Sequence, residues 1–233
     1  MKPGVLAVED RLAERLAEEF RAHIRNSEFP CVGAKSALAR DCLEIVVAFD
    51  MRSAWDDLRI HDRLIEWSQT YRDDPTGLRS IAVIFAQPTA IDETEFERLL
   101  WERLQSIADK DNWLGQSYNP EVSPDPRDLH FSLSFGGEAY FVVGLHSAAS
   151  RPARQFSHPV LVFNLHDQFE KLRAAGRYER MRETILERDR QLAGDINPML
   201  ARHGESSEAR QYSGRLVQED WECPFHDPRS ENP

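Results

Sequence analysis

Two histidines stand where apolar, strand-like runs end, and they are the side chains best placed to do chemistry. The runs cover residues 140–145 and 160–165, and each is followed directly by a histidine, His146 and His166 respectively. The sheet holds a polar group rigidly at the end of a strand, while the adjoining loop lets a ligand reach it. The positions of the two imidazoles therefore favour a binding or metal site, without naming a reaction.

His166 follows Asn164, which we expect to cap a helix that begins there. The positive end of a helix dipole disfavours an imidazolium, so this imidazole should stay neutral and keep a lone pair for a metal. Glu170, one turn on, could hold the other ring nitrogen and fix the tautomer. A solvated histidine paired with Glu170 is the ordinary alternative. For His146 the alternative is a hydrogen bond to a backbone carbonyl at a sheet edge.

Charged side chains gather in two further segments. Arg151 and Arg154 lie between the apolar runs, where they could grip carboxylates bidentately or form ordinary loop salt bridges. The segment ESSEARQYSGR mixes tyrosine, serine and both signs of charge, a mixture that fits a pocket lining as well as a solvated face. Its candidate residues are Glu205, Glu208, Arg210, Tyr212 and Arg215.

The cysteines are odd in number and lack metal-type spacing, so reduced thiols are the expected state of Cys31, Cys42 and Cys223. Cys31 lies near Lys35, a cation that could lower the pKa of the thiol. Cys223 has aromatic neighbours and precedes a proline. Either thiol could serve as a nucleophile, although a buried inert cysteine is commoner.

The order of the expected strands and helices predicts an α+β fold. We expect a mixed, largely antiparallel central sheet flanked by helices in a single domain. Apolar residues at helical spacing predict helices over residues 5–26, over residues 53–71, after a cap at Asp92 or Thr94, and over residues 177–192. Gly136 and Gly137 predict a hairpin. Residues 112–128 are expected to form an ordered surface loop. The expected strands cover 43–51, 80–86, 130–135, 138–145 and 160–163, with a helix beginning at Asn164.

Composition narrows the classes of partner. The chain has 233 residues, 41% of them hydrophobic and 30% charged, with a formal net charge of −11. This acidity makes nucleic acid and anionic membranes poor partners. No apolar run approaches the ~20 residues of a membrane helix, and the acidic, amphipathic start is unlike a signal peptide, so we expect a cytoplasmic protein. The common nucleotide-binding glycine motifs are absent from the sequence.

Six segments in order along the chain resemble the YqcI/YcgG family: FPCVGAKSAL, GGEAYFVVGLHSAASRPAR, HPVLVFNLHDQFEKLR, NPML, SEARQYSGR and WECPF. The resemblance runs from about Phe29 to Phe225. It implies an N-terminal amphipathic helix over 1–28, a YqcI/YcgG-like domain over 29–225 and a polar tail over 226–233.

The characterised branch of that family is similar to haem-dependent N-hydroxylases, so the resemblance implies a bound haem b. Its iron ligand would be His166 as first choice and His146 as second choice. Arg151 and Arg154, with Lys35, would pair with the propionates. The c-type attachment motif is absent from the sequence, so the haem should be non-covalent.

The same resemblance implies a monooxygenase that hydroxylates a nitrogen of an arginine-like guanidine or amine. Glu205 and Glu208 would meet the cationic substrate, and Tyr212 would hydrogen-bond to substrate or oxygen. An electron-donor protein is a candidate partner. Two alternatives stay open: a non-catalytic protein that binds haem or another small ligand, and an enzyme without haem that uses Cys31 or Cys223 as nucleophile.

Overall fold

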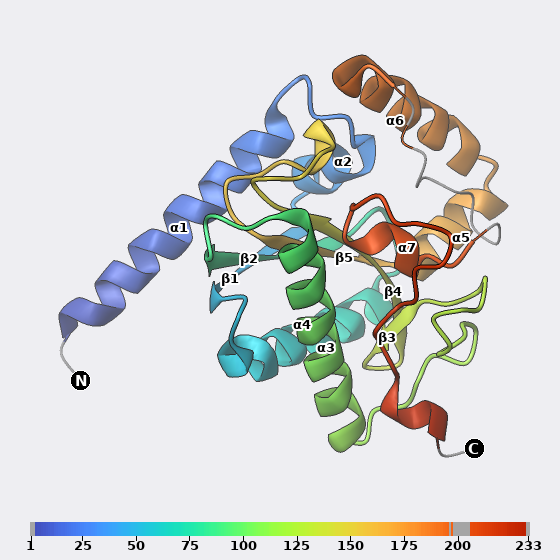
Figure 1. Ribbon diagram of the computed structural model, residues 1–233, viewed down its shortest axis with the longest axis horizontal. Coiled ribbons are helices and arrows are strands. Elements are labelled where there is room, and N and C mark those ends of the chain that lie inside the picture. The colour runs from blue at the N-terminus through green and yellow to red at the C-terminus, as the bar shows by residue number, and fades with distance from the viewer. Residues whose placement is uncertain (1–2, 196, 198–205, 232–233) are drawn as a thin grey trace.

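The computed structural model describes residues 3–195, 197 and 206–231, and within them seven α-helices surround one five-stranded sheet (Figure 1). β1 and β2 are parallel, and every other pairing is antiparallel. The predicted α+β fold with a mixed, largely antiparallel sheet is therefore confirmed. The strand order is β1 (Leu43–Asp50), β2 (Ser80–Gln87), β5 (Val160–Leu165), β4 (Glu138–Leu145) and β3 (Leu133–Phe135).

Helices cover both faces of the sheet, because each strand alternates its apolar side chains between two hydrophobic clusters. The smaller cluster joins one face to α1 and α2, and the larger joins the other face to α3 and α4. α5 and α6 follow β5, and α7 packs on β4. The helices are α1 (Pro3–Arg25), α2 (Val32–Ala39), α3 (Asp57–Asp73), α4 (Glu93–Trp113), α5 (His166–Ala174), α6 (Tyr178–Ala193) and α7 (Ala209–Tyr212).

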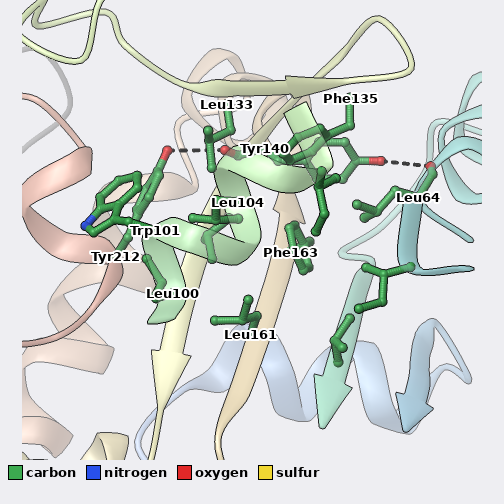
Figure 2. Close-up of a cluster of buried hydrophobic side chains, with 14 of the residues drawn as sticks. Leu64, Leu100, Trp101, Leu104, Leu133, Phe135, Tyr140, Leu161, Phe163 and Tyr212 are labelled. Carbon is green, nitrogen blue, oxygen red and sulfur yellow. Dashed lines mark hydrogen bonds between the residues drawn. The ribbon is translucent and has the colours of Figure 1, made fainter. Parts of the chain in front are cut away.

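The larger cluster is a dense aromatic core. Phe163 of β5 and Tyr140 of β4 are fully buried, with their rings edge to face at a centroid distance of 6.2 Å. The Tyr140 hydroxyl donates to the Leu64 carbonyl at 3.3 Å (Figure 2). Leu104 and Trp101 of α4 complete this part of the core. The α3/α4 face of the sheet is thus closed by large side chains, of which the Tyr140 hydroxyl has a partner whereas Trp101 Nε1 has none among the described residues.

The predicted hairpin is present, with Gly136 and Gly137 at φ 61° and 78°. Its first strand is shorter than the expected 130–135, because β3 begins only at Leu133. The carboxylate of Asp128 accepts the backbone N–H of His130 at 2.9 Å, and this local turn holds the preceding residues out of the sheet.

The start of α5 also differs from the expected one. Asn164 does not cap the helix, because it belongs to β5 and its amide is used within the sheet. The Ser80 hydroxyl donates to Asn164 Oδ1 at 2.7 Å, and Asn164 Nδ2 donates to the Phe141 carbonyl at 3.3 Å. Leu165 occupies the capping position, and His166 is the first residue of the helix.

Among the described residues, none of the helices combines the length and the apolar character that crossing a bilayer requires.

Candidate functional site

His166 and Glu208 meet at the junction of β5, α5 and α7. His166 Nε2 lies 3.7 Å from Glu208 Oε1 and 3.8 Å from Glu170 Oε1. The imidazole and the Glu208 side chain are both buried, whereas Glu170 is half exposed. Two residues predicted to share a site, 42 positions apart in the sequence, are thus brought together. Glu170 was expected to hold the ring nitrogen opposite the metal, but both carboxylates face the same nitrogen.

The first turn of α5 is tied to α3, and this fixes the position of His166. The Tyr71 hydroxyl donates to Asp167 Oδ2 at 2.6 Å, and Lys171 Nζ lies 2.6 Å from the same oxygen. Such anchoring keeps a functional side chain in one orientation.

Glu208 also lines a cavity of about 180 Å³ under α6, which we name the α7 cavity. Its other walls include Phe141 of β4, Phe169 of α5, and Met181 and Ile185 of α6. Arg173 and Arg182 also line it, so the cavity combines apolar walls with one buried carboxylate and two guanidinium groups, and Glu208 is the group that a positively charged ligand would contact.

A second cavity, of about 220 Å³, lies between the sheet, α1, α2 and α6, and we name it the α2 cavity. It shares Phe141, Phe169, Met181 and Ile185 with the α7 cavity. The two cavities therefore adjoin beneath α6, on the face of the sheet opposite the aromatic core.

His146 lies apart from both cavities. Its ring stacks on Phe96 with centroids 4.3 Å apart, and its Nδ1 is buried without a hydrogen-bond partner in the described part of the chain. Burial lowers the pKa of His146, with Glu93 and Arg154 as charged neighbours of opposite effect. The imidazole is thus kept neutral within the packed end of β4.

The three predicted propionate partners have different surroundings. Arg151 is bonded to Asp189 and Asp195, and Lys35 donates to the Ser27 carbonyl at 3.1 Å. Arg154 donates from Nη1 to the Gly144 and Tyr212 carbonyls at 3.0 and 3.3 Å, and from Nη2 to the Gln211 carbonyl at 3.1 Å. Arg151 and Arg154 line the α2 cavity, and Lys35 is not among its lining residues.

The remaining predicted site residues, apart from Glu208, are Tyr212 and Glu205. The Tyr212 ring is fully buried against Trp101 and Phe141, and its hydroxyl donates to the Tyr140 carbonyl at 3.3 Å (Figure 2). Its predicted contact with substrate or oxygen stays a prediction. Glu205 lies outside the described residues.

The neighbouring Arg210 and Arg215 stabilise the segment around α7. Arg210 lies over the Trp221 ring, with 5.8 Å between the guanidinium carbon and the ring centroid, and Arg215 Nε donates to Glu97 Oε2 at 2.6 Å. These contacts hold the segment that carries Glu208 against α4 and the C-terminal part of the chain.

The three cysteines are unpaired. Burial raises the pKa of the Cys31 thiol, and it raises that of Cys223 to about 12. Lys35 was expected to lower the pKa of Cys31, but desolvation outweighs its charge. A protonated thiol is a weak nucleophile, so these environments do not favour the cysteine-enzyme alternative.

Asp189 was missed by the sequence reasoning. It is buried, lines the α2 cavity and accepts a hydrogen bond from Arg151. The signal was present in the spacing, because Asp189 follows Met181 and Ile185 at four-residue intervals on the inward face of α6. A charged residue on an apolar helix face is a candidate for a buried ion pair.

A bare metal ion and a haem require different sets of side chains. The described residues contain no group of three or more histidine, cysteine or acidic side chains that could hold a bare metal ion. A haem needs an imidazole ligand and apolar walls, and His166, which lines neither cavity itself, contacts Glu208 of the α7 cavity wall. Each cavity is smaller than the ~300–1,000 Å³ usual for cofactor-sized ligands, so a porphyrin would require α6 to shift from the sheet.

A family model described as the YqcI/YcgG family matches residues 20–226. No curated protein and no solved structure gives a significant match. The matched range contains the whole sheet, both cavities and the His166–Glu208 pair. Because the match covers far more than half of the sequence, the chain belongs to the YqcI/YcgG family.

Proposed function

We propose that the protein is a haem-dependent oxygenase that hydroxylates a nitrogen of a small guanidine or amine, with an arginine-like compound as substrate. The observation that carries the proposal is the contact between His166 and Glu208 at the wall of the α7 cavity. It puts a coordinating nitrogen and a buried acid next to one apolar space.

In this proposal His166 would hold the haem iron, and the haem would supply oxygen activation when bound. Glu208 would pair with the cationic head of the substrate, because a buried carboxylate is stabilised by an opposite charge. Glu208 Oε1 would also accept the proton that the substrate nitrogen loses. Phe141 and Phe169 would exclude water from the reacting end of the substrate.

The first experiment is an absorption titration of the purified protein with haem b. A Soret band that grows to one haem per chain is expected, and His166→Ala should remove or shift it. His146→Ala is the matched control, since its ring packs on Phe96 away from the cavities. A band lost in His146→Ala and kept in His166→Ala would reverse the ranking of the two ligands.

The second experiment concerns turnover. Glu208→Gln should keep the Soret band and lower kcat/KM for an arginine-like amine at least tenfold, because the amide cannot neutralise the cation or take its proton. Oxygen with an electron donor, or peroxide, must be supplied. Hydroxylated product at the normal rate from Glu208→Gln would remove the acid from the mechanism.

The alternative function is non-catalytic binding of haem or another small ligand, and it is favoured by the closed, mainly apolar character of the α2 cavity. It predicts tight binding and no product under any oxidant.

The oxygenase proposal also includes a cytoplasmic location and a protein electron donor. The unpaired cysteines support the reducing compartment.

A further inference from the structure

The α2 cavity carries an excess positive charge. The charged residues among its described lining are Arg151, Arg154 and Asp189, two cations against one anion. Asp189 is bonded to Arg151, which also contacts Asp195. The protein as a whole has a net charge of −11, so a local excess of cation at a buried surface is a specific feature of this site.

Arg154 is the source of that excess. Its guanidinium is surrounded by the carbonyl oxygens of Gly144, Gln211 and Tyr212, which accept hydrogen bonds and bring no charge. In the described part of the chain, no carboxylate forms an ion pair with it within 4.0 Å. Burial lowers the pKa of Arg154 to about 10, so the group is still charged at neutral pH. Asp189 acts on Arg154 only at longer range, and a buried cation with no carboxylate in contact is costly, so an anionic ligand would offset that cost.

Of the other polar groups of the lining, Arg151 Nε is buried without a hydrogen-bond partner among the described residues, whereas Ser80 and Gln168 already have partners. Ser80 donates to Asn164, and the Gln168 amide exchanges two hydrogen bonds with the backbone of Arg79. Burial raises the pKa of the Cys31 thiol, so it is uncharged at neutral pH and does not repel an anion. The ligand therefore needs one anionic head, and its body meets apolar walls.

Those walls are aliphatic and aromatic. Phe20 and Ile24 of α1, Phe29, Val143 of β4 and Val162 of β5 all line the cavity. A volume of about 220 Å³ gives room for roughly seven non-hydrogen atoms, at the ~30 Å³ that each water-sized group occupies. An unbranched acid of six carbons matches this size.

We propose that the α2 cavity binds a small organic carboxylate, with the acid group on Arg154 and the hydrocarbon body between α1, α2 and the sheet. This site is separate from the His166–Glu208 pair, and the inference stands whether or not the protein is an oxygenase. The same carboxylate chemistry could come from a free acid or from a haem propionate. We assign it to a free acid.

The test is calorimetric titration of haem-free protein with hexanoate, hexan-1-ol and hexylamine. Hexanoate should bind at one site per chain, at least tenfold more tightly than the alcohol, and the amine should not bind measurably. Equal affinities for acid and alcohol, or no binding of the acid, would overturn the proposal.

Three variants locate the site. Arg154→Gln should lower the affinity for hexanoate at least tenfold, while Lys35→Gln, which removes a nearby cation that does not line the cavity, should leave it unchanged. Because Arg154 also links three backbone carbonyls, Val162→Phe provides a second route: it fills the cavity and keeps the arginine. Unchanged hexanoate binding in Val162→Phe would place the acid elsewhere and refute the assignment.

A parallel haem titration distinguishes a free acid from a haem propionate as the carboxylate bound to Arg154. If haem binds with Arg154-dependent affinity, haem dimethyl ester does not, and hexanoate fails to bind the haem-free protein, then Arg154 is a propionate partner and the free-acid proposal is wrong. Hexanoate binding without any Soret band would support the carboxylate site and count against the proposed oxygenase.

Discussion

The two faces of the sheet are built differently. On the α3/α4 face the side chains are large, aromatic and fully buried, and the Tyr140 and Tyr212 hydroxyls reach hydrogen-bond partners, whereas Trp101 Nε1 is buried without one in the described part of the chain. On the α1/α2/α6 face the side chains are smaller, the α2 and α7 cavities adjoin, and Arg154 forms no ion pair in contact with a carboxylate in the described part of the chain.

This difference separates stability from binding. A densely packed face contributes most of the hydrophobic stabilisation, because cavities forfeit contacts. The looser face can accept a ligand without losing core packing. His166 and Glu208 lie where the two regions meet, since α5 is anchored to α3 through Asp167 while Glu208 lines a cavity under α6. The comparison predicts that substitutions on the two faces will have unequal effects.

The largest effect should come from Phe163→Ala. This ring is fully buried in the aromatic core, so its removal should lower the free energy of unfolding by about 3–5 kcal/mol. Val162→Ala, on the same strand but facing the α2 cavity, should cost less than half as much. Urea unfolding of both variants measures the difference, and equal losses would show that the two faces contribute alike.

The next effect should come from Asp111→Asn. The buried Asp111 accepts from Arg229 Nη1 at 2.6 Å and contacts His61 Nε2 at 2.7 Å, which joins the C-terminal segment to α3 and α4. Loss of the charge should destabilise the fold by about 3 kcal/mol. This value is near the lower end of the cost of breaking a buried ion pair, because Arg229 keeps its ion pair with Asp227.

The exposed neighbour Asp109→Asn is the control for that variant and should change stability by at most about 0.5 kcal/mol. If both asparagine variants unfold at the same urea concentration, the buried network does not hold the α3/α4 face together.

A smaller effect, of the opposite sign, is expected for Gly33→Ala. A methyl group there would lie 3.5 Å from Leu78 Cδ1 and 3.8 Å from Cys31 Sγ, which is ordinary contact on the looser face. The fold should gain about 0.4–1 kcal/mol, because the unfolded chain loses freedom. Gly136→Ala should instead destabilise, since Gly136 has φ 61° and its added carbon would lie 2.6 Å from Ile65 Cδ1. Thermal melting of the pair decides the signs.

The smallest effect concerns pH. Burial lowers the pKa of His146 in the folded state, so the unfolded chain takes up its proton first as the pH falls through about 6.5. Stability is therefore lost from about pH 6.5 down to the lower folded pKa, and His23 and His158 act in the same direction. His146→Gln should show a smaller loss of stability between pH 7 and pH 5 than the parent. An identical loss would mean that the His146 proton does not contribute.

Local patterns were enough to predict the fold class and most elements. The apolar, strand-like runs at β4 and β5 and the glycine pair of the hairpin are local signals, and they were found at the expected places. The misplaced start of α5 has a nonlocal cause, because the Asn164 amide is used by Ser80 of β2 and Phe141 of β4. The identity of a haem and the oxygenase activity stay predictions.

The sequence alone determined where helices and strands form, because their periodicity depends on neighbouring residues. It also determined the family and the types of side chain that can bind a ligand, because both can be seen in short segments of the chain. Only the folded chain shows that Glu208 faces His166, that Arg154 is surrounded by carbonyl groups and that Tyr212 is buried in the core. These facts depend on contacts between segments far apart in the chain. Long-range packing, which no local pattern encodes, sets which side chains meet and which charges stay unpaired.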